Sequence, residues 1–511
     1  MNELLIDGKS LTLENVAHVA YDLDCKTQLK LSPKARSAMQ KSRDFIATKL
    51  GGKNSKKEDE AIYGVNTGFG LLSKVRISNN QLDQLQLNLL RSHAVGVGRP
   101  LSEAEARASI LLRANTLAQG YSGVTPDVVD ALLALLNRGV HPWIPEQGSV
   151  GACGDLAPLA HLALVLIGEG QAYFKGKLLP GSTALKLAKL KPYKLRPKEG
   201  LSLINGTQIM TAIGVLAYLK AEALAHMADV AGAMTIEALA GSAAPFDPDI
   251  QRVRPHEGQV KVAAHMRKLL ENSEIMNSHI DCDKVQDPYS LRCIPQVHGI
   301  VRDTLKHAKK ILKTEINSVT DNPIVFAGGR GGGKIVNAGN FHGEYVGMAM
   351  DQLCIAVAEL ASISEQRIEK LINPALSGLP AFLVKEGGLN SGFMIVQVAA
   401  ASLVSENKVL CHPATVDSIP TSADKEDHVS MGTIAARKVR AVVENSWNVI
   451  AMELFAASQG LEFRKPLKAA RRIDRAYRLI RSRVPPVHQD RAFYVDIQAV
   501  GELMREGSLV F

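Results

Sequence analysis

Five long segments with helical periodicity occupy the chain from Thr207 onward, and they constrain the fold more than any other feature of the sequence. Apolar residues recur there at three- and four-residue intervals, over residues 207–241, 297–317, 342–372, 391–412 and 429–460. Each segment is longer than an ordinary globular helix, and helices of this length usually pack side by side in a bundle. Their core must be aliphatic, because apolar residues make up 46% of the chain and aromatic residues only 5%. We therefore predict a mainly α-helical protein with a central bundle of long helices.

The first two hundred residues have a different pattern, in which short segments are separated by glycine turns. The segment 171–181 predicts a β-hairpin with Lys175 and Gly176 at its turn. We expect two consecutive regions: a mixed N-terminal region over residues 1–204, and the long-helix bundle with C-terminal helices over residues 205–511.

The sequence gives no sign of a leader, a membrane span or a metal site. The N-terminus has no basic segment followed by an apolar run, so we expect no signal peptide. The longest apolar stretch, 209–240, contains Lys220, Asp229 and Glu237, which predicts a buried helix and no membrane partner. None of the six cysteines has zinc-ligand spacing, so we expect free thiols, no metal and a cytoplasmic location.

The net charge of +9 is concentrated near the C-terminus, where residues 464–491 hold ten lysines and arginines against two aspartates. Five arginines of this segment recur along one side of a predicted helix: Arg471, Arg472, Arg475, Arg478 and Arg481. One interpretation is an anion-binding surface, and the other is a solvated or subunit-facing helix. We favour the second and expect no nucleic-acid partner, because no aromatic interleaving or nucleic-acid motif accompanies the stripe.

The segment with the clearest chemical content is GSVGACGDLAPLAHLALVLIGEG, residues 148–170. Three small residues, Ala152-Cys153-Gly154, stand directly before a predicted helix with Asp155 as its cap. Backbone N–H groups at the start of a helix create a positive potential. That potential favours an electrophile that must accept electron density.

This segment resembles the aromatic amino acid ammonia-lyase family, and within it most closely the enzymes that act on histidine. In that family an Ala-Ser-Gly tripeptide cyclises and loses water to become a methylidene-imidazolone, so the resemblance implies this internal group and no dissociable cofactor. The chain departs from the family at the central position, where Cys153 replaces serine. Loss of hydrogen sulfide from Cys153 would give the same product as dehydration of serine.

The resemblance covers nearly the whole chain and rests on further motifs: YGVNTGFG (63–70), LLRSHAVGVG (89–98), GLSLINGTQ (200–208), QDPYSLRC (286–293), NFHGE (340–344) and SADKEDHVSMG (422–432). It implies the catalytic residues Tyr63, Tyr289 and Glu426. It also implies the electrophile-forming residues Ala152, Cys153 and Gly154, and the substrate-binding residues His93, Asn205, Gln286, Arg292 and Phe341. Other histidines and cysteines, namely His161, His298, His342, Cys282 and Cys293, are interpreted as structural or stay unassigned.

The chemistry of the implied reaction explains these residue types. The electrophile takes the substrate amine and makes it a better leaving group, while a strong base removes a β-proton. A tyrosinate with a lowered pKa fits the base, so Tyr63 is the first candidate and Glu426 the second. Arg292 suits a substrate carboxylate, because guanidinium makes two parallel hydrogen bonds. His93 and Glu426 suit an imidazole.

The resemblance implies elimination of ammonia from L-histidine to give urocanate, the first step of histidine degradation, in a homotetramer whose sites combine several subunits. Tyrosine ammonia-lyase and aminomutase activities stay open as alternatives, although Glu426 favours histidine, since the enzymes for aromatic substrates usually carry glutamine there. A third alternative is an inactive homologue that has lost its electrophile, with Cys153 as the sign. The retained Tyr63 and Arg292 motifs argue against it.

Overall fold

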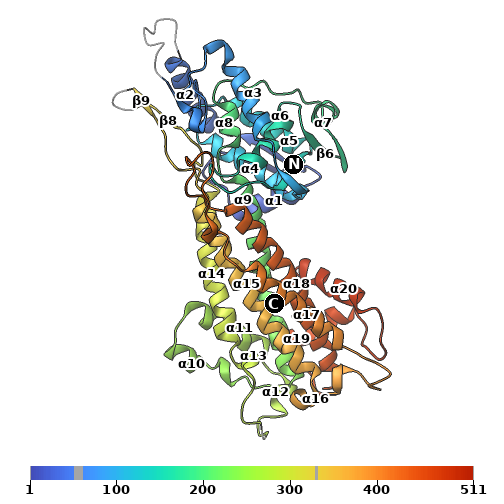
Figure 1. The fold of residues 1–511 in the computed structure, drawn as a ribbon. Coiled ribbons are helices and arrows are strands. Elements are labelled where there is room, and N and C mark those ends of the chain that lie inside the picture. Colours follow the sequence, from blue (N-terminus) through green and yellow to red (C-terminus); the bar gives the residue numbers. More distant parts are fainter. Residues whose placement is uncertain (1, 51–60, 283, 329–331, 510–511) are drawn as a thin grey trace. The chain divides into compact units, whose positions relative to one another are not determined.

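The computed structural model describes residues 2–50, 61–282, 284–328 and 332–509, and the chain divides into two compact units (Figure 1). Unit 1 comprises residues 1–216, 309–351 and 413–437, and unit 2 comprises residues 217–308, 352–412 and 438–511. This division differs from the two consecutive regions 1–204 and 205–511 that the sequence predicts. The physical reason is that four long helices each contribute residues to both units: α9 (Gln208–Ala238), α14 (Ile294–Glu315), α15 (Glu344–Ile372) and α18 (Gly432–Glu462).

Unit 1 combines shorter helices with small sheets. Its further helices are α1 (Leu13–Tyr21), α2 (Pro33–Lys49), α3 (Leu82–His93), α4 (Glu103–Ala118), α5 (Pro126–Asn137), α6 (Leu156–Leu166), α7 (Gly181–Leu187) and α8 (Glu199–Ile204). Its strands form a parallel pair β1 (Asn2–Ile6) and β2 (Thr27–Leu31), and antiparallel pairings among β3 (Val97–Pro100), β4 (Val140–Pro142), β5 (Pro145–Gln147), β6 (Gln171–Phe174), β7 (Lys177–Pro180), β8 (Ile324–Ala327) and β9 (Gly333–Val336). Short 3₁₀ turns are η1 (Gly70–Lys74), η2 (Asn79–Gln81) and η5 (Thr415–Asp417).

The predicted hairpin is confirmed as β6 and β7, which pair antiparallel with Phe174 opposite Lys177. Lys175 and Gly176 form the turn with φ values of +50° and +73°. Positive φ at both central residues is what a tight two-residue hairpin requires, and glycine adopts it without steric cost.

The regular elements of unit 2 are helices, joined by loops that include an isolated bridge between Gly387 and Asn390. Its further elements are η3 (Ala244–Phe246), α10 (Pro248–Val253), α11 (Glu257–Leu269), α12 (Glu274–Asn277), α13 (Tyr289–Arg292), α16 (Pro374–Ser377), η4 (Ala381–Leu383), α17 (Met394–Leu410), α19 (Arg471–Arg481) and α20 (Phe493–Arg505). The five long helices predicted from periodicity are α9, α14, α15, α17 and α18, and each observed bound lies within three residues of the prediction. The mainly helical fold class is therefore confirmed.

Two buried charges of the long helices, Asp229 and Glu453, have hydrogen-bond partners on neighbouring helices. Asp229 of α9 is fully buried, and its carboxylate accepts hydrogen bonds from His298 and His265 at 2.7 Å each. Glu453 of α18 accepts two hydrogen bonds from the buried Arg367 of α15, at 2.6 and 2.8 Å. Buried charges are tolerated only with partners of this kind.

Three described helical stretches are long and apolar enough to cross a membrane by length and composition alone: Gln208–Ala238, Glu344–Ile372 and Met394–Asp417. The most apolar window is 72% buried in the first and 67% buried in the second, but only 22% buried in the third. The burial of α9 agrees with the predicted buried helix. The apolar face of α17 is largely exposed on the single chain.

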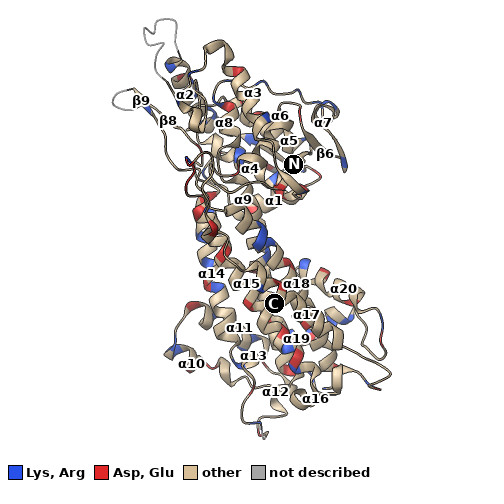
Figure 2. Ribbon diagram, viewed as in Figure 1, with Lys and Arg blue, Asp and Glu red and all other residues tan. Residues whose placement is uncertain are grey.

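The basic stripe lies on α19 (Figure 2), and several of its arginines are engaged by neighbours. Arg478 forms an ion pair with Asp474 at 2.8 Å, and Arg481 forms one with Glu462 at 2.8 Å. Arg472 donates to the carbonyl oxygen of Lys268. These contacts agree with the interpretation of α19 as a structural helix.

Candidate active site

The tripeptide Ala152-Cys153-Gly154 lies in unit 1, in the tight turn that leads into α6. Gly151 and Gly154 form a β-bridge, so the backbone folds back between them. The amide of Gly206 donates to the carbonyl oxygen of Cys153 at 3.2 Å, and the carbonyl oxygen of Gly206 accepts from the amide of Asp155 at 2.8 Å. The segment that ends α8 therefore holds the turn from one side.

Gly154 is required at its position by both conformation and space. Its φ is +74°, a value that residues with a side chain rarely adopt, and a Cβ placed on it would lie 2.1 Å from the carbonyl oxygen of Gly206. Such a contact is shorter than real Cβ atoms allow, so the backbone would have to move. The residues present thus fit a tripeptide held in a tight turn.

Asp155 occupies the N-cap position of α6, but the prediction that it caps this helix is wrong, because its side chain makes no hydrogen bond there. Its carboxylate accepts instead from the amides of Ile209 and Met210, both at 2.9 Å, and from the hydroxyl of Thr433. It therefore caps α9 and ties the turn to α18. Burial raises the pKa of Asp155 to about 6.

The thiol of Cys153 donates to Oε1 of Glu426 at 3.2 Å, and Oε2 of Glu426 accepts from the hydroxyl of Thr421 at 2.9 Å. Burial raises the pKa of the Cys153 thiol, and the nearby charge of Glu426 raises it further. The sulfur is therefore protonated at neutral pH, and Glu426 is the carboxylate in contact with it.

Tyr63 lies in the glycine-rich segment 63–70, where its ring meets the edge of Phe69 with centroids 6.3 Å apart. The expectation of a lowered tyrosine pKa is wrong for the single chain. Burial raises the pKa of Tyr63, and the nearby carboxylate of Glu426 adds to the effect, although a backbone hydrogen bond from Gly70 opposes it.

His93 is the last residue of α3, and burial lowers its pKa. A lowered pKa keeps the imidazole neutral near pH 7, so one ring nitrogen donates and the other accepts. Its Nδ1 lies 3.1 Å from the hydroxyl of Ser92.

Two adjoining pockets, of about 590 and 740 Å³, share Tyr63, Cys153, Asn205 and Glu426 in their walls. His93 lines the first pocket, while Ala152 and Phe341 line the second. Unit 1 thus brings together, from six separate segments, the following predicted site residues: Tyr63, His93, Ala152, Cys153, Asn205, Phe341 and Glu426. Their combined space is ample for a free amino acid.

Gln286, Tyr289 and Arg292 belong to unit 2 and form a cluster of their own. With its amide turned so that oxygen faces the guanidinium, Gln286 accepts from the two Nη atoms of Arg292 at 2.8 and 3.1 Å. Arg292 also lies over the ring of Tyr289, 4.5 Å from its centroid, and Tyr289 is 71% exposed. Within the described residues, none of the three lines the two pockets around Cys153.

The structure adds buried polar residues behind the pockets that the sequence interpretation did not include. Arg113 of α4 is fully buried and donates to the carbonyl oxygen of Asn205 at 2.7 Å. Lys198 and Asp321, both fully buried, form an ion pair at 3.3 Å next to α8. The one sequence signal for Arg113 is a charge inside the otherwise apolar run Ile110-Leu111-Leu112, which by itself does not say where the charge points.

Comparisons with known proteins agree with this arrangement. The sequence profile of the aromatic amino acid lyases matches residues 11–482. The chain is 54% identical to a histidine ammonia-lyase of Anaeromyxobacter dehalogenans, over 100% of both chains. The crystal structure of histidine ammonia-lyase from Trypanosoma cruzi superposes with a TM-score of 0.90 at 45% identity, covering 99% of this chain and 94% of that one. Tyrosine aminomutase from Streptomyces globisporus gives a TM-score of 0.90 at 38% identity, with coverage of 99% and 97%.

The long helices carry a tripeptide in a tight turn, with a half-buried tyrosine and glutamate beside it, and the class of protein is a carbon–nitrogen lyase of the ammonia-lyase type. The chain belongs to the aromatic amino acid lyase family. Within that family the relatives of higher identity named above are histidine ammonia-lyases.

We expect G154A to destabilise the protein much more than G176A, a matched control with the same backbone conformation. Gly176 has a φ of +73° and no atom within 4 Å of an added Cβ among the described residues. G176A should therefore cost only the left-handed strain of about 1–2 kcal/mol. G154A should cost about 1–3 kcal/mol more, because the backbone of Gly206 must also move. Denaturant unfolding of both variants measures the difference, and equal losses would show that close approach does not select glycine at 154.

Proposed function

We propose that the chain removes ammonia from L-histidine and releases urocanate. One observation carries the assignment: Glu426 places a carboxylate, and His93 a neutral imidazole, on the wall of the pocket that also holds Tyr63 and Cys153. An imidazole side chain offers one N–H donor and one nitrogen acceptor. The Glu426 carboxylate and the His93 imidazole can together hydrogen-bond to both of these substrate atoms. The full-length similarity to a histidine ammonia-lyase supports the same substrate.

The electrophile proposed here arises from the chain's own tripeptide. The nitrogen of Gly154 bonds to the carbonyl carbon of Ala152, and the carbonyl oxygen leaves as water with the amide hydrogens of Gly154 and Cys153, so that a C=N bond forms between Ala152 and Cys153. The Cα–H and Cβ–Sγ bonds of Cys153 then break, and sulfur leaves as hydrogen sulfide. The close approach of Gly154 to Gly206 supports this proposal, because it holds the turn in the compact form that ring closure needs.

The protonation state of Cys153 supports the second of these steps. The departing sulfur carries its own hydrogen as hydrosulfide, so the thiol is the form competent to leave, whereas a thiolate would have to leave as a dianion. Burial and Glu426 both raise the pKa of Cys153 and so keep that hydrogen in place. Hydrosulfide is also a better leaving group than hydroxide.

Once formed, the methylidene-imidazolone supplies an electron-poor carbon that engages the substrate amine. The residues around it then have separate tasks. Tyr63 takes the β-proton, and Glu426 is the second candidate for this base. His93 and Glu426 orient the substrate imidazole, while Asn205 and Phe341 hold the space next to residues 152–154.

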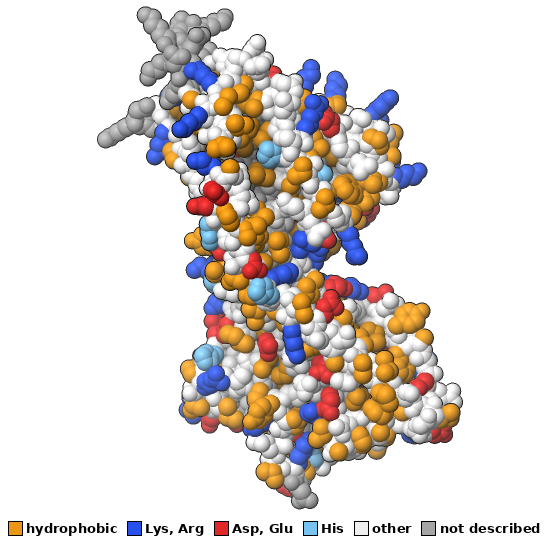
Figure 3. All heavy atoms as spheres, in the orientation of Figure 1, with side chains coloured by type: hydrophobic (Ala, Val, Ile, Leu, Met, Phe, Trp, Pro, Cys, Tyr) orange, Lys and Arg blue, Asp and Glu red, His pale blue; other side chains and the backbone are white. Residues whose placement is uncertain are grey.

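The carboxylate-binding group of the proposal is Arg292, with Gln286 and Tyr289 beside it. Because these residues lie in unit 2 and Tyr289 is 71% exposed, we propose that they complete the site of another copy in a homotetramer. The exposed apolar face of α17 supports such an assembly, with Ile395 at 63% and Val409 at 77% exposure. Figure 3 shows hydrophobic side chains on the surface of the chain. Faces of this kind normally mark contacts between proteins.

We also propose that the enzyme is cytoplasmic and has no metal, nucleic-acid or membrane partner. The similarity to tyrosine aminomutase keeps aromatic amino acids as the alternative substrate class. Glu426 weighs against them, because its half-buried carboxylate finds no hydrogen-bond donor on a phenyl ring.

L-Histidine is expected to be consumed with accumulation of urocanate, which is measured directly by its ultraviolet absorbance. E426Q should lower kcat/KM for histidine, since the amide removes the negative charge that faces the imidazole. A higher kcat/KM for tyrosine than for histidine in the unaltered chain would overturn the substrate assignment.

Y63F should lower kcat by about two to four orders of magnitude, the usual scale for loss of a general base. The fold should be unaffected, because only a hydroxyl is removed from a ring that keeps its contact with Phe69. Steady-state kinetics with circular dichroism as the control measures both. A folded variant with near-normal kcat would transfer the role to Glu426.

Intact-mass spectrometry tests electrophile formation from Cys153. Ring formation predicts a deficit of one water plus one hydrogen sulfide, and no thiol at position 153. C153S should retain activity and lose two waters, whereas C153A should lose all activity, because it has no group to expel. A full-mass protein with a titratable Cys153 would favour the inactive-homologue alternative.

A further inference from the structure

The peptide that joins Asn205 to Gly206 has hydrogen bonds on both of its sides. Its N–H, which belongs to Gly206, points to the carbonyl oxygen of Cys153 at 3.2 Å. Its carbonyl oxygen, which belongs to Asn205, accepts from Nη1 of Arg113 at 2.7 Å. One rigid peptide therefore connects the guanidinium of Arg113 to the carbonyl of the central residue of the tripeptide.

Arg113 is a fully buried charge that makes its contacts through a single nitrogen. Its Nη1 also donates to Oε1 of Gln208 at 2.8 Å and lies 3.5 Å from the carbonyl oxygen of Thr320. Its Nε and Nη2 atoms have no hydrogen-bond partner within the part of the chain that the structure describes. Burial lowers its pKa to about 10, so it stays protonated at neutral pH.

The same nitrogen also sets the position of Gly206. A Cβ placed on Gly206 would lie 2.6 Å from Nη1 of Arg113 and 2.2 Å from the carbonyl oxygen of Thr320. Gly206 in turn is the residue whose carbonyl oxygen a Cβ on Gly154 would meet. Arg113, Gly206 and Gly154 are thus stacked in contact, and the guanidinium limits how far Gly206 can withdraw from the tripeptide.

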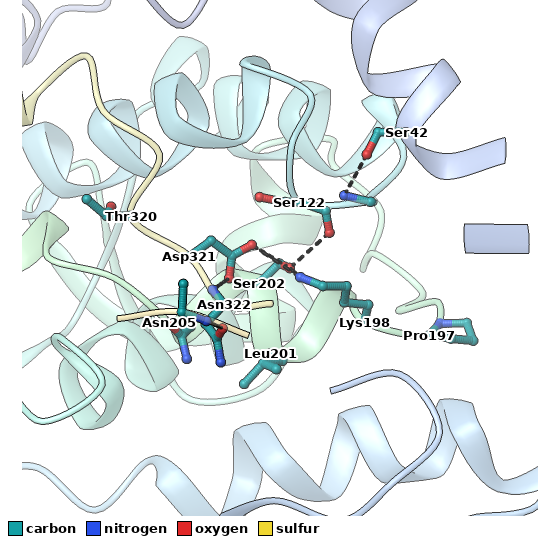
Figure 4. A network of polar contacts seen from close by, with 12 residues as sticks. Ser42, Ser122, Pro197, Lys198, Leu201, Ser202, Asn205, Thr320, Asp321 and Asn322 are labelled. Carbon is teal, nitrogen blue, oxygen red and sulfur yellow. Dashed lines mark hydrogen bonds and ion pairs between the residues drawn. The ribbon is translucent and has the colours of Figure 1, made fainter. Parts of the chain in front are cut away.

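A second buried group holds the other end of this segment. Lys198 immediately precedes α8, and its ammonium donates to the hydroxyl of Ser202 at 2.8 Å and pairs with Asp321 at 3.3 Å. Ser202 also donates to Asp321 at 3.0 Å (Figure 4). With Lys198 and Asp321 fixing the start of α8, Arg113 is the contact that fixes its end at Asn205.

We propose that Arg113 is a positioning residue for the electrophile, acting through the Asn205–Gly206 peptide to hold and polarise the N–H that faces the Cys153 carbonyl oxygen. The inference rests on the ring closure proposed above. A cation on the carbonyl side of a peptide strengthens the hydrogen bond that its N–H donates, because successive bonds polarise one another. In the closed ring the Cys153 carbonyl is conjugated with the exocyclic carbon, so a stronger donor on its oxygen makes that carbon more electrophilic.

The test uses the full chain, with R113M and R113Q as variants that remove the charge in different shapes and R113K as the variant that keeps it. R107M is the matched control. Arg107 is a buried arginine on the same helix. It donates to the carbonyl oxygen of Val19 and contacts His141, and neither of these contacts involves Asn205. Intact mass reports ring closure. The rate of mass gain with cyanide reports electrophilicity, since cyanide carbon bonds to the exocyclic carbon and water supplies the proton.

We expect folded R113M and R113Q either to lack the mass deficit or to add cyanide at least about tenfold more slowly than the unaltered chain. This decrease in rate is smaller than the decrease expected from loss of a whole oxyanion donor, because the Gly206 N–H remains. R113K should form the ring and add cyanide within about threefold of the unaltered chain, because it keeps a cationic donor. R107M should show the full deficit and an unchanged rate, even if it is less stable. A folded R113M or R113Q with normal deficit and rate, or an equal loss in R107M, would overturn the proposal.

Failure of the underlying function is distinguished by the unaltered chain itself. If that chain shows no mass deficit, ring closure from Cys153 fails, and the same four variants are compared in the C153S background. In that background, loss of the mass deficit or slower cyanide addition in R113M or R113Q, but not in R107M, supports the role of Arg113. Absence of the ring from C153S itself counts against it.

Discussion

The backbone of Gly154 lies so close to that of Gly206 that Gly154 has no room for a Cβ, and Thr320 and Arg113 leave no room for one on Gly206. This contact determines much of unit 1. The tripeptide turn can be compact only if the end of α8 is held against it, and α8 is held by Arg113 from α4 and by the Lys198–Asp321 pair. Asp155 adds the start of α9 and Thr433 of α18. Segments distant in sequence therefore meet at one turn.

This compact arrangement buries several charged residues that have few possible partners. Arg113, Lys198 and Asp321 are fully removed from solvent, and each would be costly if its partner were lost. Burial also shifts the groups that carry chemistry: it raises the pKa values of Tyr63 and Cys153 and lowers that of His93. The pocket of the single chain thus holds a protonated tyrosine, a protonated thiol and a neutral imidazole. In the proposed mechanism, deprotonation of Tyr63 depends on groups that the complete site would add, and the cation Arg292 is one of them.

The division of residues between the units has a similar consequence. Tyr63, His93, Cys153, Asn205 and Glu426 meet in unit 1, whereas the arginine suited to the carboxylate lies in unit 2 with an exposed tyrosine beside it. A site completed by a second copy requires exposed, partly apolar surfaces on the single chain, and α17 provides one. In the proposed assembly, the surfaces that folding leaves exposed on the single chain are the ones that a second copy would cover.

The sequence by itself determined the five long helices, because their 3.6-residue periodicity is local and extends over many turns. It also indicated the residues of the proposed site, because Ala152-Cys153-Gly154, Tyr63 and Glu426 stand in motifs that can be recognised without a structure. Only the tertiary structure decided that Asp155 caps α9 instead of α6, that the pKa of Tyr63 is raised, and that Arg113 reaches the carbonyl of Asn205. It also decided that the units interleave along the chain. These facts depend on burial and on contacts between residues tens to hundreds of positions apart, and neither is encoded in any local pattern of residue types.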